Sequence, residues 1–314
     1  MVRTAGHDAA ASVAGDIVVA DFNSGFVART YVAADGLRLH ARDYGGDDPR
    51  TRDRLPVFCL PGLTRNSRDF HQLALLLAGD PDEPRRILTL DYRGRGQSQW
   101  DETGQSYTLL AEAQDVLAAA SHFGIERAIF IGTSRGGLTL HLLAQLQPSL
   151  LAAVILNDIG PVIEPEGLRQ IRAYLSLDRR PRDWAEAAAM LQRIHGDAFP
   201  ALTDQDWCDM AQAIHADRSG TLVSDFDPEI ARQLSAADLD QPLPHLWPQF
   251  DALRGIPLMT IRGENSPLLS AATLSAMAER HPGMTALTVK GQGHAPLLHL
   301  GEIPAVIRAF LSGR

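Results

Sequence analysis

A serine flanked by glycines lies near the middle of the chain, in the stretch IGTSRGG (131–137). The apolar run AIFIG ends at its start, and the amphipathic run GLTLHLLAQLQ (137–147) follows it, which predicts a strand, a tight turn and a helix. On such a turn the backbone is strained, only small neighbours fit, and the hydroxyl is lifted above the sheet edge at the helix N-terminus. Ser134 is therefore a candidate nucleophile.

A histidine near the far end of the chain can supply the general base that such a serine needs. His294 stands in GQGHAPLL (291–298), directly after the apolar run TALTV (285–289). Gly291 and Gly293 flank it, so a flexible loop can carry the imidazole over the serine. Because imidazole exchanges protons near neutral pH, Ser134 and His294 together predict nucleophilic acyl transfer.

The elements that must position these residues follow a simple alternation. TYVAADGLRLHARD (30–43) alternates around an Asp-Gly turn, which predicts a β-hairpin. After it, short apolar runs typical of buried parallel strands alternate with amphipathic segments, which predicts a mainly parallel α/β sheet flanked by helices. The runs are 56–60, 86–91, 128–132, 152–157, 257–261 and 285–289, and the amphipathic segments are 70–78, 109–122, 138–147 and 268–280.

The alternation stops for about ninety residues between Gly160 and Leu253, where helical patterns occur without a strand-like run. Thr203 with Asp206 predicts a capping box, and Asp227 before a proline predicts another helix start. We therefore expect an inserted helical cap. The predicted helices are 165–177, 182–195, 202–216 and 228–234, and the predicted division is an N-terminal extension (1–28), a first core part (29–160), the cap (161–252) and a second core part (253–314).

Composition excludes several classes of partner. The formal net charge of −9 over 314 residues disfavours nucleic acid and anionic membranes, since such surfaces repel an acidic protein. No apolar run is long enough to cross a bilayer, and residues 1–28 contain aspartates that do not fit a secretory signal. Cys59 and Cys208 form no metal spacing or disulfide framework, which favours a reducing cytoplasm. These patterns do not define an oligomeric state.

Four stretches in a fixed order give the chain a resemblance to the α/β-hydrolase superfamily that covers roughly residues 29–314. The cap resembles that of meta-cleavage-product hydrolases, haloalkane dehalogenases and related esterases and lactonases. Haloalkane dehalogenases and epoxide hydrolases use an aspartate at the elbow, so Ser134 argues against both. The four stretches are LPGLTRNSRDF (60–70), DYRGRGQS (91–98), GTSRGG (132–137) and GQGHAPLL (291–298).

The resemblance also implies an oxyanion hole and an acid. The oxyanion donors would be the backbone N–H groups of Leu63 and Arg135. In most of the superfamily the acid follows the strand predicted at 257–261, but the chain there reads RGENSPLL, with serine and proline where an aspartate is expected. Two carboxylates remain as candidates: Asp158, which follows the run 152–157 as in some superfamily members, and Glu264. We favour Asp158, and the alternative for it is an ion pair with Arg135.

These features together predict a serine hydrolase that acts on a small or medium apolar ester, lactone or activated ketone, without metal or organic cofactor. Two other functions stay open: a cofactor-free oxygenase or lyase that uses His294 and an acid as bases, and a non-catalytic ligand receptor on the same scaffold. Large apolar side chains of the cap could line the substrate pocket or form the cap's own core. They are Trp184, Leu191, Phe199, Trp207 and Trp247.

Overall fold

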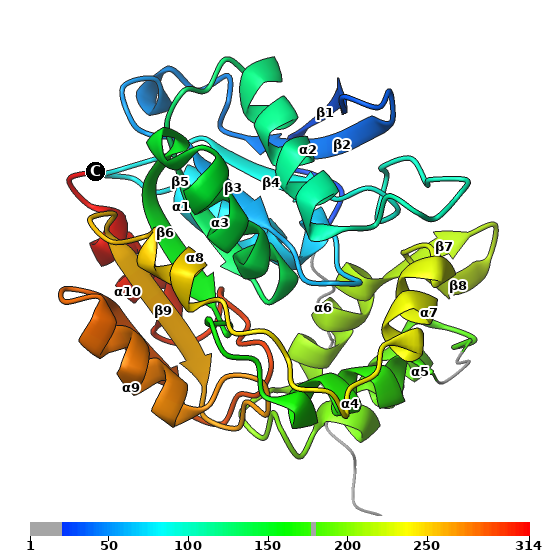
Figure 1. Cartoon of the computed structure of the whole chain (residues 1–314). Helices are drawn as coiled ribbons and strands as arrows, with labels where there is room; N and C mark the ends of the chain where they lie inside the picture. Colours follow the sequence, from blue (N-terminus) through cyan, green and yellow to red (C-terminus); the bar gives the residue numbers. More distant parts are fainter. Residues whose placement is uncertain (1–20, 177–179) are drawn as a thin grey trace, which may run out of the picture.

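An eight-stranded sheet forms the centre of the computed structural model, which describes residues 21–176 and 180–314 (Figure 1). Residues 1–20 of the predicted N-terminal extension lie outside the described residues, as does Leu177 at the end of a predicted helix. The strand order is β1-β2-β4-β3-β5-β6-β9-β10. The strands are β1 (Val27–Val32), β2 (Arg38–Tyr44), β3 (Val57–Leu60), β4 (Ile87–Asp91), β5 (Ala128–Thr133), β6 (Leu151–Asn157), β9 (Leu258–Gly263) and β10 (Thr285–Val289).

The sheet begins with the predicted hairpin and continues in parallel. β1 pairs antiparallel with β2, and β2 pairs antiparallel with β4. From β4 to β10 every neighbouring pair is parallel, so the carboxyl ends of these strands meet at one edge. The predicted fold class, a mainly parallel α/β sheet flanked by helices, is confirmed.

Helices cover both faces of the sheet, and the period-two alternation of the strands decides which side chain meets which helix. On β3, Phe58 and Leu60 pack with α2 (Leu109–His122), α3 (Arg135–Leu146) and α8 (Trp247–Asp251), which lie in front of the sheet in Figure 1. Val57 and Cys59 point to the other face and pack with α1 (His71–Ala78) and α10 (Ile303–Leu311). The remaining core helix is α9 (Ala271–Arg280), and the short 3₁₀ turns are 49–51, 67–70 and 148–150.

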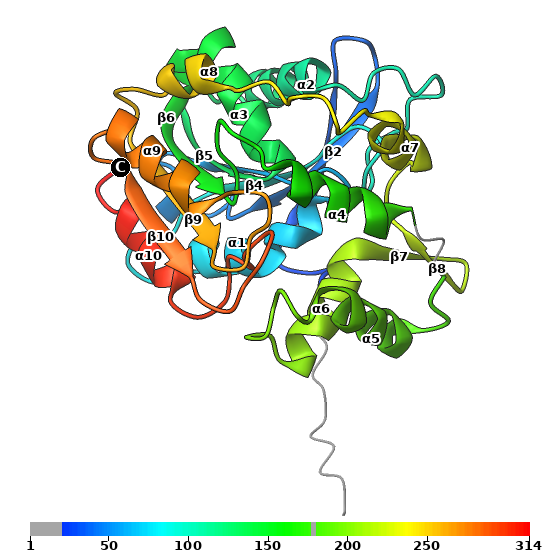
Figure 2. The same cartoon turned by 60° about the horizontal axis from the view of Figure 1, so that its bottom comes forward.

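The segment between β6 and β9 is inserted over the carboxyl ends of the parallel strands (Figure 2). It has an apolar cluster of its own, which includes Leu191, Phe199, Trp207 and Met210. The predicted caps are confirmed, because Thr203 forms a capping box with Asp206 and the Asp227 side chain accepts a hydrogen bond from the Glu229 amide. The elements are α4 (Pro165–Leu175), α5 (Trp184–His195), α6 (Asp204–Ile214), β7 (His215–Arg218), β8 (Thr221–Ser224) and α7 (Pro228–Ala236).

The insertion departs from the sequence prediction in two places. The helix predicted over 202–216 ends at Ile214, and an antiparallel hairpin of β7 and β8 follows it. Ser219 and Gly220 both have positive φ angles, 57° and 83°, as a two-residue hairpin turn requires. In addition, Phe250 of α8, within the range predicted for the cap, packs into the core beside α3.

None of the helices in the described part of the chain has both the length and the apolar character required for a membrane span.

Candidate active site

Ser134 occupies the turn between β5 and α3, with φ 51° and ψ −113°. A residue with a side chain rarely adopts this region, so the surroundings must enforce it. Glycines on both sides allow the required close approach: a β-carbon on Gly136 would collide with the Leu60 carbonyl oxygen, and one on Gly132 would lie 2.6 Å from the Gly136 carbonyl carbon. The strand, turn and helix predicted around Ser134 are therefore present, with the hydroxyl on the exposed side of the turn.

His294 connects the serine to a carboxylate. Its Nε2 lies 2.9 Å from the Ser134 Oγ, and its Nδ1 lies 2.7 Å from the Asp158 Oδ2. The imidazole is on the loop after β10 and is 12% exposed. Residues separated by 160 positions in the chain thus meet at hydrogen-bonding distance, in the geometry that general-base activation of a serine needs.

Asp158 directly follows β6 and is fully buried. Its Oδ1 accepts a hydrogen bond from the Gly263 amide (2.8 Å), and its Oδ2 accepts one from the Ser266 hydroxyl (2.6 Å) in addition to facing His294. Burial of a carboxylate is costly unless it is hydrogen-bonded, and these partners provide that compensation. They also fix the carboxylate against the imidazole.

The two alternatives weighed for the acid have other partners. Glu264 is exposed, and its Oε2 accepts from the Gly291 amide at 2.9 Å rather than from His294. Arg135 forms an ion pair with Glu112 at 2.7 Å, so it does not occupy the Asp158 carboxylate. Of the two candidate acids, Asp158 is the one beside His294.

Leu63 and Arg135 are the residues proposed for the oxyanion hole. Leu63 lines the same pocket as Ser134, and Arg135 is the first residue of α3. Within residues 21–176 and 180–314, the backbone N–H groups of Leu63 and Arg135 donate to no carbonyl oxygen or side chain. Both amides are thus available to a ligand.

A buried glutamate links these two residues. Glu112 on α2 is fully buried and lies 3.0 Å from Arg95 Nη1 and 2.7 Å from Arg135 Nε. Arg95 in turn donates from Nε to the Leu63 carbonyl oxygen (2.9 Å). The sequence analysis missed Glu112, although a signal was present: at 109–122 it falls on the same helix face as Val116 and Ala119.

The turn DYRGRGQS (91–98) serves as scaffold. Burial alone would raise the pKa of Asp91, but hydrogen bonds from His40 and from the amides of Gln97 and Ser67 outweigh it and lower that pKa to about 2. Asp91 therefore stays ionised, and its Oδ1 accepts from the Ser67 amide at 2.6 Å. This contact secures the loop that carries Leu63.

The same loop is joined to the insertion. Arg68 donates from Nε to the Gln212 carbonyl oxygen (3.0 Å), and its Nη2 forms an ion pair with the buried Asp225 (2.8 Å). The Gln72 amide donates to Asp209 of α6 at 2.8 Å. The loop after β3 and the insertion are therefore held together by charged and polar contacts.

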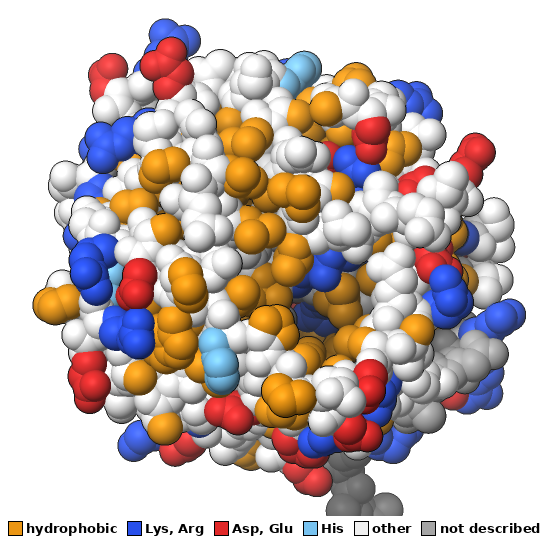
Figure 3. Space-filling model, in the orientation of Figure 1, with side chains coloured by type: hydrophobic (Ala, Val, Ile, Leu, Met, Phe, Trp, Pro, Cys, Tyr) orange, Lys and Arg blue, Asp and Glu red, His pale blue; other side chains and the backbone are white. Residues whose placement is uncertain are grey.

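A pocket of about 200 Å³ opens from Ser134 and His294 between the core and the insertion. Figure 3 shows a hollow at this place, with hydrophobic side chains around it and basic surface inside. Of the large apolar residues predicted for the cap, Leu191 and Phe199 line the pocket, whereas Trp207 is buried in the insertion's own cluster. Trp184 is 37% exposed, and Trp247 packs against Phe250.

Comparisons with known proteins identify the family of this chain. The alpha/beta hydrolase fold family matches residues 56–298. A 3-hydroxybutyrate-oligomer hydrolase of Cupriavidus necator is 31% identical over 289 residues, which cover 90% of this chain and 96% of that protein. A 2-(acetamidomethylene)succinate hydrolase of Mesorhizobium japonicum is 25% identical over 74% of this chain and 79% of its own length.

Among solved structures, an alpha/beta hydrolase from Novosphingobium aromaticivorans superimposes with a TM-score of 0.83 at 42% identity, covering 92% of this chain and 98% of that one. The chain therefore belongs to the alpha/beta hydrolase fold family. It is a hydrolase, as its relatives are, which confirms the enzyme class predicted from the sequence.

Proposed function

We propose that this protein is a serine hydrolase that cleaves a carboxylic ester through an acyl-enzyme on Ser134. The observation that carries the proposal is the pair of short hydrogen bonds at His294, 2.9 Å to the Ser134 Oγ and 2.7 Å to the Asp158 Oδ2. The order nucleophile, base and buried acid is the arrangement that activates a serine hydroxyl in acyl transfer.

In the first half of the proposed reaction, the Ser134 Oγ forms a bond to the ester carbonyl carbon while its proton moves to His294 Nε2. The carbonyl oxygen becomes an anion and accepts hydrogen bonds from the Leu63 and Arg135 amides. The anion then collapses, the bond to the leaving alcohol breaks, and His294 returns the proton to the alcohol oxygen. Asp158 holds the imidazole in the tautomer with its proton on Nδ1 and stabilises the imidazolium.

In the second half, water takes the place of the alcohol. His294 accepts a proton from the water while the water oxygen bonds to the acyl carbon. The second anion then collapses, the bond between the acyl carbon and the Ser134 Oγ breaks, and His294 returns the proton to Oγ, which releases the acid and restores the hydroxyl. His294 thus carries every transferred proton, and Asp158 orients and stabilises its imidazole without taking a proton itself.

For the substrate, we propose a short ester of a small hydroxy acid. The pocket volume of about 200 Å³ supports a small or medium molecule, and a relative that covers 90% of this chain is a 3-hydroxybutyrate-oligomer hydrolase. Small lactones and activated ketones, which offer the same electrophilic carbonyl, belong in the same test panel.

A fluorophosphonate probe, which bonds covalently to activated serines, tests the nucleophile. We expect labelling of Ser134 in the wild-type protein and none in Ser134→Ala, together with a loss of ester turnover of about 10⁴-fold or more. Substantial turnover in Ser134→Ala would instead support an oxygenase or lyase that uses His294 as a base. Tight binding of a small ligand without labelling would support a receptor.

A further inference from the structure

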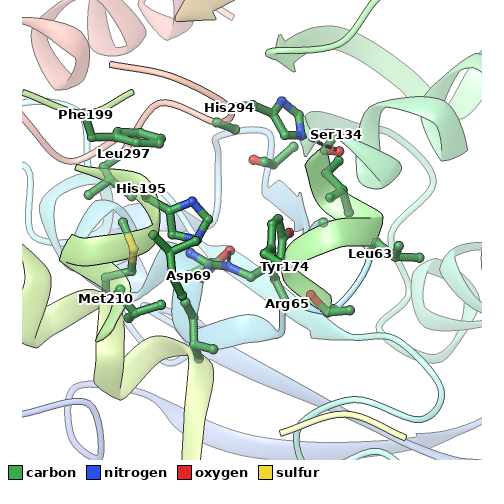
Figure 4. A pocket seen from close by; sticks show the side chains of 18 of the residues that line it. Leu63, Arg65, Asp69, Ser134, Tyr174, His195, Phe199, Met210, His294 and Leu297 are labelled. Carbon is green, nitrogen blue, oxygen red and sulfur yellow. Dashed lines mark hydrogen bonds and ion pairs between the residues drawn. The ribbon is translucent and has the colours of Figure 1, made fainter. Parts of the chain in front are cut away.

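One basic side chain enters the otherwise largely apolar pocket. Arg65 is the sole arginine or lysine among the lining residues in the described part of the chain, and its side chain is 25% exposed. It lies on the loop after β3, two residues beyond Leu63. Figure 4 shows Arg65 grouped with Asp69, Tyr174 and His195 at one side of the pocket, apart from the Ser134 and His294 pair.

The guanidinium of Arg65 is held from one side. Its Nε donates to the Asp69 Oδ2 at 2.7 Å, and this carboxylate is 12% exposed. Its two terminal nitrogens have no hydrogen-bond or ion-pair partner among residues 21–176 and 180–314. Asp69 therefore orients the guanidinium and leaves its terminal fork open to the pocket.

Arg65 also begins close to the nucleophile. A β-carbon on Gly62 would lie 3.4 Å from the Arg65 Cγ and 3.9 Å from the Ser134 Cβ, so the two side chains flank the same glycine. The base of the Arg65 side chain thus lies close to Ser134, and its guanidinium extends further along the same pocket.

Two polar side chains near Arg65, Tyr174 and His215, are neutral, and a neighbouring arginine is already paired. Burial raises the pKa of Tyr174, and burial together with the charges of Arg65 and Arg68 lowers the pKa of His215, so both stay uncharged near pH 7. Arg68 is paired with the buried Asp225. Within the described lining of the pocket, no second arginine or lysine competes for an anion at the Arg65 fork.

A partly buried arginine with a free fork is a strong binder of carboxylates. The guanidinium keeps its charge, and its parallel N–H groups match the two oxygens of a carboxylate. Asp69 compensates the charge at Nε, but a neutral substrate that displaces water from the two terminal nitrogens would leave them without a charged partner, at a cost in free energy. An anionic substrate group would compensate for that cost when it binds.

We propose that Arg65 binds a free carboxylate of the substrate, so that the enzyme selects esters that carry an acid group a few atoms from the scissile carbonyl. This inference rests on the proposed esterase function and specifies its substrate class. Arg65 is a specificity residue here, and Asp69 positions it.

The test compares two compounds of equal size: the linear dimer of 3-hydroxybutyrate as free acid, and the same dimer with its carboxylate replaced by a primary amide. We expect the wild-type kcat/KM to favour the acid by about 30-fold, the effect of a charge-assisted bidentate pair. Arg65→Met should bring the ratio close to one, and Arg65→Lys should keep part of it, because a lysine retains the charge without the fork.

Arg169→Met is the matched control. Arg169 on α4 also forms an ion pair with an aspartate, Asp240 at 3.2 Å, but it does not line the pocket. Its substitution removes one positive charge from the insertion, and we expect the ratio to stay within twofold of wild type. Where a compound is not hydrolysed, its inhibition constant is measured with p-nitrophenyl butyrate as the substrate. The acid-to-amide ratio of binding strength is then compared in place of the ratio of kcat/KM.

The inference is wrong if the wild-type protein treats acid and amide alike, or if Arg65→Met lowers both equally. Labelling of Ser134 by a fluorophosphonate distinguishes failure of the carboxylate site at Arg65 from failure of the proposed esterase function. Labelling with an acid-to-amide ratio near one leaves the esterase standing and removes the carboxylate site, whereas absence of labelling and of ester turnover removes the esterase itself.

Discussion

Two adjacent strands, β6 and β9, each end in a carboxylate at the same edge of the sheet, yet the two carboxylates have different surroundings. Asp158 follows β6, is buried, has φ 55° and contacts three hydrogen-bonding groups. Glu264 follows β9, is exposed and accepts from the Gly291 amide. Because β6 and β9 pair in parallel, both carboxylates emerge at the same edge of the sheet, and of the two Asp158 contacts His294.

The difference shows that the two strand ends have separate roles at the catalytic acid. β6 supplies the charge, while β9 supplies two donors that hold it, the Gly263 amide and the Ser266 hydroxyl. Ser266, at the position where the sequence resemblance leads one to expect an aspartate, therefore acts on the acid of the neighbouring strand.

The largest effect should come from Asp158→Asn. An asparagine cannot accept from His294 Nδ1 while it also keeps both of its other partners, so the imidazole is held in the wrong tautomer. We expect kcat for p-nitrophenyl butyrate to fall about 10⁴-fold with little change in KM. A loss of less than tenfold would show that the acid lies elsewhere.

Moving the carboxylate from one strand end to the other should recover part of this loss. Ser266 Oγ lies 2.6 Å from the Asp158 Oδ2, so an aspartate at 266 places a carboxylate beside the atom whose charge Asp158→Asn removes. We expect Asp158→Asn with Ser266→Asp to exceed the single Asp158→Asn variant about 10- to 100-fold in kcat, short of wild type. Ser266→Asp alone is the control, and it should lose activity because two buried carboxylates repel each other.

A smaller effect is expected for Ser266→Ala. The substitution leaves the charge in place but removes one hydrogen bond to a buried carboxylate, worth about 1.5–3 kcal/mol of unfolding free energy. We expect about a tenfold loss of kcat, since the carboxylate is less well oriented. Urea denaturation measures the free energy of unfolding, and steady-state kinetics measures kcat. If neither value changes, Ser266 does not hold the Asp158 carboxylate in place.

The smallest effect should follow Glu264→Gln. Its Oε2 contacts one amide on the surface, and glutamine retains an acceptor oxygen there. We expect kcat within threefold of wild type and a change in unfolding free energy below about 0.5 kcal/mol. A loss of kcat approaching that of Asp158→Asn would place Glu264 in the catalytic machinery and reverse the comparison.

The core and its strand ends could be predicted because their signals are local. The apolar run 152–157 ends at the same residue as β6. Asp158 is therefore placed at the sheet edge beside Ser134, although the run does not predict the direction of its side chain. The same holds for Ser134 and His294, each of which follows a short buried strand.

The features that sequence reasoning missed depend on contacts between distant segments. The β7–β8 hairpin has a two-residue turn signal at Ser219-Gly220, but the helix predicted over 202–216 extends two residues into β7 and the hairpin was not predicted. Arg65 and Asp69 lie four residues apart on a loop, a spacing that suits an ordinary surface pair. Arg65 and Asp69 line a pocket because the insertion folds over them. The local sequence around the two residues does not predict this contact.

The contacts that fasten the loop after β3 to the insertion have a consequence for protein engineering. Arg68 reaches Gln212 and Asp225, and Gln72 reaches Asp209, so the segment that carries Leu63 is supported by residues well over a hundred positions away. A chimera that received the insertion between β6 and β9 from another family member would lose this support for the loop after β3. Substrate specificity is therefore best transferred by exchanging residues 61–72 together with the insertion between β6 and β9.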